Sequence, residues 1–166
     1  IRTLFQSQKE FFTNRNFIVY TLSAILGMSC LFSFFSVSTI ILISNLNVSV
    51  ANFGYYFALN ALIFIISSFL CTVFQKKLSS PALAAIGIGL VLVGSTIMWL
   101  LALYSGLTVT IFMAPMLIIT FGVGLSMGPS ASQIMLPFPN KAGSASATFG
   151  ALQFVIAAFV GSYIVY

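Results

Sequence analysis

Residues 16–75 read NFIVYTLSAILGMSCLFSFFSVSTIILISNLNVSVANFGYYFALNALIFIISSFLCTVFQ and contain no charged side chain. A helix that crosses a bilayer needs about 20 apolar residues. This block of 60 residues therefore predicts two crossings and a turn, with both ends of the block on the same side of a membrane. Residues 78–140 form a second uncharged block of the same kind, and residues 142–166 are long enough for one more crossing. The sequence predicts five membrane spans.

The composition agrees with this class of protein. Of the 166 residues, 60% are hydrophobic and 4% are charged, whereas about a quarter are charged in a water-soluble domain. The mean hydropathy is +1.16. We therefore expect an all-α integral membrane protein with membrane lipid as its surroundings. The net charge of +5 does not indicate nucleic-acid binding, because the basic residues flank apolar runs and do not share a polar surface with aromatic residues.

Charge placement predicts the topology. All six Lys and Arg residues fall in the amino-terminal segment, in loop 75–80 or in loop 137–141, and none falls in the turns at 45–49 and 105–106. Cytoplasmic loops carry an excess of basic residues, so these three regions are expected on the cytoplasmic side. Residues 1–16 are expected to form an amphipathic connector on the membrane surface. The cytoplasmic loop residues are Lys76, Lys77 and Lys141, and the expected spans of the helix bundle are 17–44, 50–74, 81–104, 107–135 and 142–166.

The residue types exclude most catalytic chemistry. The chain has no His and no Asp, and its one acidic residue, Glu10, precedes the first span. Cys30 and Cys71 lie in different spans. A metal site needs several His, Cys or carboxylate ligands, and a serine hydrolase needs a base beside its nucleophile. We therefore expect no enzyme activity, no catalytic residue, no metal and no cofactor. A proton relay needs a carboxylate or His within the membrane, so a coupling group is expected outside this chain.

Neutral polar residues are the candidates for contact with a substrate. Asn60 lies near the middle of the second span and shares a helical face with Tyr56. Gln153 lies near the middle of the fifth span. Ser33 belongs to a serine stripe in the first span, and Phe57 is a candidate for an apolar cavity wall. Two interpretations stay open, namely substrate contact in a cavity, or hydrogen bonds to neighbouring helices and to the preceding turn.

Small residues and prolines form a second pattern. Gly124 and Gly128 make a GxxxG motif in the fourth span, and such faces let helices approach closely. Pro129 lies inside the same span and favours a kink. Gly143 and Gly150 belong to small-residue faces of the fifth span. These five residues are candidates for gating or packing, and the pattern fits both moving helices and static contacts.

Two stretches carry a resemblance to a known family. They are Asn52-Phe53-Gly54 with Phe57-Ala58-Leu59-Asn60-Ala61, and the series Gly122-Val123-Gly124, Pro129, Pro137-Phe138-Pro139, Ala142-Gly143-Ser144-Ala145-Ser146-Ala147 and Gly150-Ala151-Leu152-Gln153. Over residues 10–166 the sequence resembles the carboxyl-terminal half of a major facilitator superfamily transporter. The most similar branch is the bicyclomycin- and chloramphenicol-resistance (Bcr/CflA) group of drug:proton antiporters. Loop 75–80 departs from that group, because a lysine pair stands where arginines with glycine are usual.

The resemblance implies a fold and a function. The five spans would be helices 7–11 of a twelve-helix fold, and the chain, which begins at Ile1 without an initiator Met, would lack the amino-terminal half and the last helix. The whole protein would be a secondary active transporter of a bacterial inner membrane. It would export drugs or other small amphipathic molecules by alternating access, with the proton as coupling ion. The alternative is a non-transporting membrane subunit or assembly protein held by small-residue helix packing.

Overall fold

The computed structural model describes residues 9–164, and within this range every regular element is helical. The five long helices confirm the all-α fold, and each is long and apolar enough to cross a membrane. Their order is α2 (Arg15–Thr39), which continues into η1 (Ile40–Asn45), then α3 (Val50–Phe74), α4 (Ser80–Ser105), α5 (Val109–Met135), the short η2 (Pro139–Lys141) and α6 (Ala142–Tyr163).

Polar side chains begin three of these helices. Asn14, Ser49 and Thr108 each accept a hydrogen bond from the backbone N–H three residues later, at 3.1, 3.3 and 3.3 Å. Such caps satisfy one of the free N–H groups at a helix start. The cap at Thr108 explains why α5 begins at Val109, two residues later than the sequence pattern predicts.

The first span ends in a wider helix that the sequence pattern does not predict. Ile40–Asn45 form a π-helical turn, and the N–H of Leu46 donates to the carbonyl of Ile41 five residues earlier. Asn47 then adopts a positive φ of 52°, which Asn tolerates better than most residues do. This geometry turns the chain sharply into α3.

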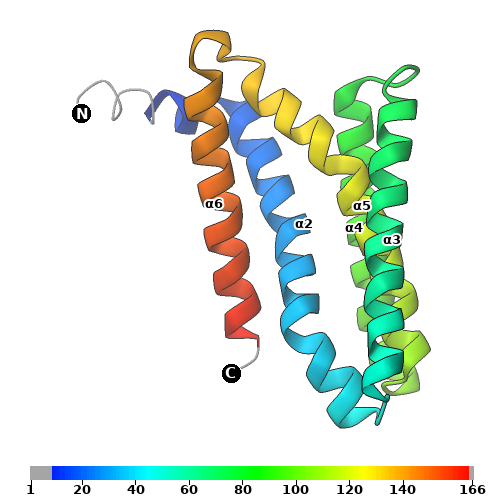
Figure 1. Cartoon of the computed structure of the whole chain (residues 1–166). Helices are drawn as coiled ribbons and strands as arrows, with labels where there is room; N and C mark the ends of the chain where they lie inside the picture. Colours follow the sequence, from blue (N-terminus) through cyan, green and yellow to red (C-terminus); the bar gives the residue numbers. More distant parts are fainter. Residues whose placement is uncertain (1–8, 165–166) are drawn as a thin grey trace.

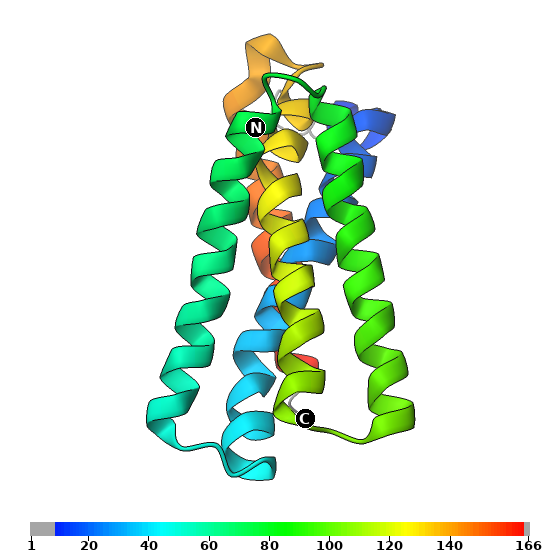
Figure 2. The ribbon, with the colours of Figure 1, turned by 90° about the vertical axis from the view of Figure 1, so that its right-hand side faces the viewer.

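Helix α5 lies at the centre of the bundle. It packs against α4, α3 and α2, whereas α6 packs mainly against α2 (Figure 1). Figure 2 shows α5 between α3 and α4. In the most apolar stretch of α5, 61% of the residues are buried, against 17% in α3 and in α4. The outer helices therefore leave most of their apolar side chains on the surface, where lipid or further helices can cover them.

Glycines allow close contact between the backbones of α4 and α5. A methyl group built on Gly87 would lie 2.5 Å from the carbonyl oxygen of Gly122, and one built on Gly122 would lie 2.5 Å from the carbonyl oxygen of Gly87. Gly94, seven residues after Gly87, comes similarly close to Ile119 of α5. The roles of Gly87 and Gly94 could not be predicted from the sequence, because they depend on which helix lies opposite these residues.

Charged residues gather at one end of the bundle. The connections 75–79 and 136–141 and residues 9–14 lie together at one end, and the turns 46–49 and 106–108 lie at the other (Figure 1). The first end carries every charged residue of the described range: Lys9, Glu10, Arg15, Lys76, Lys77 and Lys141. The helices therefore alternate in direction as the charge pattern predicts.

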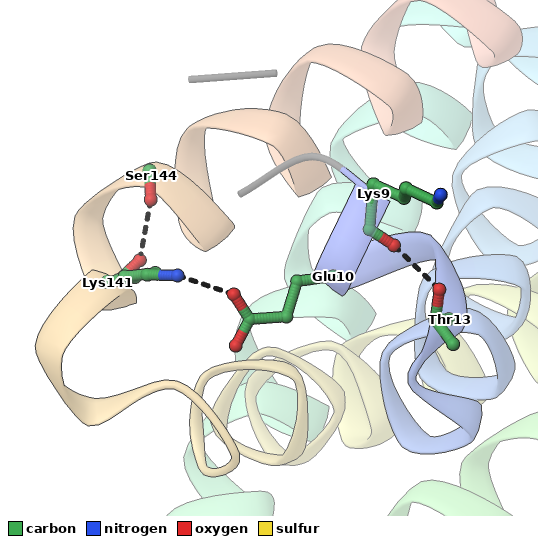
Figure 3. Close-up of polar contacts among 5 residues, drawn as sticks. All are labelled: Lys9, Glu10, Thr13, Lys141 and Ser144. Carbon is green, nitrogen blue, oxygen red and sulfur yellow. Dashed lines mark hydrogen bonds and ion pairs between the residues drawn. The ribbon is translucent and has the colours of Figure 1, made fainter. Parts of the chain in front are cut away.

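The described part of the connector is docked on the charged end of the bundle. Residues 9–13 are helical, and Phe11 is fully buried between Phe17 and Phe138, with ring centroids 5.4 and 4.8 Å away. Lys141 forms an ion pair with Glu10 (Figure 3). Phe11 is thus packed inside the protein and not at a lipid surface. The rest of the predicted amphipathic segment, residues 1–8, lies outside the described residues.

Candidate substrate cavity

A small apolar cavity lies among α2, α3 and α5, and we call it the Asn60 cavity. Its volume is about 320 Å³. Eight of its lining residues are apolar and two, Asn60 and Thr120, are polar. The lining residues are Met28, Leu31, Phe35, Phe57, Asn60, Ala61, Phe64, Ile65, Thr120 and Met127. The sequence predicts two of them, Asn60 and Phe57, as cavity residues.

Asn60 belongs to the one face of α3 that the bundle buries. The buried residues of this helix are Asn60, Ser67 and Cys71, so its most polar face is turned inward. Asn60 is 4% exposed, and its side-chain amide nitrogen has no hydrogen-bond partner. Polar groups within membrane spans typically face the interior or a cavity, as this one does.

Thr120 is the second polar residue of the cavity, and it is not among the residues predicted from the sequence. It is 1% exposed and its hydroxyl group also lacks a partner. Helical threonines often donate to the carbonyl four residues earlier. Thr13, Thr72, Thr96 and Thr148 do so here. Its position in the sequence could have indicated this role, because Thr120 lies four residues before Gly124 and so shares a helical face with it. In the structure, α3 covers this face.

Asn60 and Thr120 lie at a similar depth. Both α3 and α5 run from the uncharged end to the charged end, and they pack against each other. Asn60 is ten residues after the start of α3, and Thr120 is eleven after the start of α5. At 1.5 Å per residue, each lies roughly 15 Å along its helix, near the middle of a bilayer about 30 Å thick.

Aromatic rings form the wall of the cavity toward the uncharged end. Phe57 lies 5.4 Å from Phe35 and 6.0 Å from Phe34, measured between ring centroids. Phe34 in turn stacks on Phe112 of α5 at 6.0 Å. These contacts join α2, α3 and α5 beside the polar pair. The site therefore combines flat apolar surfaces with two hydrogen-bonding groups.

Ser33 lies elsewhere, in a second cavity of about 550 Å³. This Ser33 cavity is lined by residues of α2, α4, α5 and α6, among them Cys30, Ser95, Trp99 and Val160. The Ser33 hydroxyl donates to the carbonyl of Ser29 at 2.8 Å. Ser33 therefore makes the bond to the preceding turn, which was the alternative interpretation of the serine stripe.

The other two predicted cavity residues line neither cavity. Gln153 is 2% exposed on the face of α6 that packs against α2, one turn from Ala157. Tyr56 is half-buried against the apolar core that Leu42 and Phe34 share with α5. Of the five predicted cavity residues, the structure brings together Asn60 and Phe57.

The predicted gating or packing residues also fall into two groups. Gly124 is in close contact with α3, because a methyl group built on it would overlap the hydroxyl of Ser67, and Pro129 is fully buried in α5. A methyl group on Gly128, Gly143 or Gly150 would meet nothing within 4 Å. Those three positions have no close neighbour among the described residues. Lys76 and Lys77 are exposed in the loop between α3 and α4.

Within residues 9–164, no three His, Cys, Asp or Glu side chains lie close enough together to hold a metal ion. The ion pair between Glu10 and Lys141 is partly exposed at the charged end of the bundle, far along the helices from Asn60. The Asn60 cavity can therefore bind a ligand through apolar contacts and through hydrogen bonds to uncharged groups.

Five helices that are each long and apolar enough to cross a membrane define a multi-pass membrane protein. A sequence model of the Major Facilitator Superfamily matches residues 1–162, and the chain belongs to this family of transporters, which are not enzymes. Two similar proteins are a chloramphenicol resistance protein of Pseudomonas aeruginosa, 25% identical over 150 residues, and a bicyclomycin resistance protein homolog of Haemophilus influenzae, 29% identical over 154 residues.

The matched regions cover 90% and 87% of this chain but 36% of each relative. The chain thus spans little more than a third of the length of these curated relatives. No solved structure gives a significant match.

Proposed function

We propose that this chain is part of a secondary active transporter that exports drugs or other small amphipathic molecules. The observation that carries the proposal is the family match over residues 1–162. The names of the two relatives, which refer to chloramphenicol and bicyclomycin resistance, favour export of antibiotics. An apolar cavity with two neutral polar groups suits weak binding of many amphipathic compounds.

In this proposal the five long helices correspond to helices 7–11 of a twelve-helix fold. The charged end, with Lys76, Lys77 and Lys141, faces the cytoplasm of a bacterial cell, and the uncharged turns face outward. The amino-terminal half and the twelfth helix come from parts of the protein outside these residues. The 36% coverage of both relatives supports this assignment.

Transport then follows from two bundles that rock against each other around a midplane site. The Asn60 cavity is the part of the substrate wall that this chain supplies, with Phe57 for apolar contact. Helix α5 is the candidate for bending, because Gly124 and Pro129 lie in it beside the substrate wall. Gly128, Gly143 and Gly150 leave room for close contact with helices outside this chain.

The proton is the coupling ion in this proposal. Glu10 is paired with Lys141 outside the spans, so the proton-binding group is assigned to the part of the protein outside this chain. Export would then stop when the proton gradient is dissipated.

A drug-susceptibility profile of cells with and without the complete gene tests the proposed function. We expect the gene to raise the tolerated concentration of at least one amphipathic antibiotic, with chloramphenicol and bicyclomycin in the panel. A protonophore should abolish the export of that compound from loaded cells. An unchanged profile over the whole panel would contradict the proposal and favour a non-transporting subunit or assembly protein.

A further inference from the structure

We propose that Asn60 and Thr120 jointly bind a hydrogen-bond acceptor, such as a carbonyl oxygen, on an uncharged ligand in the Asn60 cavity. This inference rests on the proposed transport function, and it adds the chemical class of the ligand and a second binding residue. It starts from two polar atoms that the protein itself leaves without partners.

Asn60 and Thr120 differ from the other residues with unpartnered buried polar atoms because they line the same cavity. Within the described range, five buried side-chain polar atoms have no hydrogen-bond partner, and they belong to Thr21, Ser38, Asn60, Thr120 and Ser130. Asn60 and Thr120 line the Asn60 cavity, whereas the other three line neither cavity. The two cavity residues come from different helices, lie at a similar depth and line the same cavity.

The hydrogen-bonding capacity of the pair selects the ligand group. An amide nitrogen of Asn can only donate, and a Thr hydroxyl can donate as well. A carbonyl oxygen has two lone pairs and can accept from both donors at once. At mid-membrane depth there is little water to replace a missing partner, so an unpaired donor is costly and a ligand acceptor is favoured.

The rest of the wall selects an uncharged, partly aromatic ligand. No lining residue of the Asn60 cavity carries an ionisable side chain, so this wall offers no partner to a charged group removed from water. Phe35, Phe57 and Phe64 supply flat surfaces for the apolar body of the ligand. A diaryl ketone has both features.

Binding of benzophenone and of diphenylmethane to the purified complete protein tests this inference. The two compounds have similar shapes, and only benzophenone has a carbonyl group. After correction for partition into protein-free membranes, we expect the wild-type protein to prefer benzophenone. Thr120→Val and Asn60→Leu should each lower that preference about 2- to 10-fold, which is the contribution of one hydrogen bond.

Two further variants separate binding from a structural role. Thr120→Ser keeps the hydroxyl and should keep the preference, and Ser130→Ala removes an unpartnered hydroxyl away from the cavity and should also keep it. The inference is overturned if the wild-type protein shows no preference for benzophenone. It is also overturned if Thr120→Val and Asn60→Leu leave the binding of both compounds unchanged, or weaken the binding of both compounds equally. Because binding is measured without transport, a chain that binds with this preference but confers no resistance would contradict only the proposed function.

Discussion

At the scale of single residues, the structure separates glycines in close contact from glycines that face open space. Gly124 and Gly128 belong to the same GxxxG motif of α5. A methyl group on Gly124 would overlap the Ser67 hydroxyl and lie 3.0 Å from the carbonyl oxygen of Phe64. A methyl group on Gly128 would meet nothing within 4 Å. The motif therefore contains one contact position and one open position.

We predict that Gly124→Ala destabilises the complete protein by about 1–3 kcal/mol, because the added methyl group overfills the contact between α3 and α5. Ser67→Ala in the same background should restore part of the loss, since it removes the overlapping hydroxyl. Gly89→Ala in α4 is the matched control and should cause no loss, because its added methyl group would meet nothing within 4 Å. Thermal unfolding of the purified protein measures all three. Equal stability of Gly124→Ala and wild type would disprove the predicted contact.

At the scale of elements, two kinds of contact hold the connector to the bundle. Phe11 is fully buried between aromatic rings, whereas the Lys141 and Glu10 side chains are 43% and 52% exposed. An exposed ion pair contributes only about 0.2–1 kcal/mol, and truncation of a buried Phe costs about 3–5 kcal/mol. The aromatic contact should therefore dominate the docking of residues 9–14.

We predict that Phe11→Ala speeds trypsin cleavage after Lys9 and Arg15 in the purified complete protein by roughly tenfold or more, because it raises the population of the undocked connector. Phe12→Ala is the matched control, since Phe12 is 52% exposed in the same helical segment. That variant and Glu10→Gln should change the rate by less than about threefold. A larger effect of Glu10→Gln than of Phe11→Ala would reverse our ranking of the two contacts.

The helices could be predicted from sequence because each is long, has no charged residue except Arg15 at the start of α2, and is bounded by polar residues such as Asn14 and Thr108. Features that depend on which helices are neighbours could not. Gln153 and Asn60 both look like mid-span polar residues, but one faces α2 and the other a cavity. The shared cavity of Thr120 and Asn60 and the π-helical turn at Ile40–Asn45 also follow from packing and not from periodicity.

At the scale of the whole molecule, the distribution of charge and the position of the Asn60 cavity together indicate how the helices lie in the membrane. All described charges lie at one end of five apolar helices, and the Asn60 cavity lies midway along them. A bundle with this asymmetry has one orientation that satisfies the positive-inside rule. The depth assigned to Asn60, and with it the water-poor environment of the polar pair, depends on these helices crossing the membrane.

Cysteine labelling of the complete protein in cells tests this topology most directly. In a Cys30→Ser, Cys71→Ser background, single cysteines replace Asn47 and Ser105 at the uncharged end, and Lys76 and Lys141 at the charged end. We predict that a membrane-impermeant maleimide labels Asn47→Cys and Ser105→Cys on intact cells, and Lys76→Cys and Lys141→Cys only after permeabilisation. Labelling of Lys76→Cys or Lys141→Cys from outside an intact cell would contradict the account.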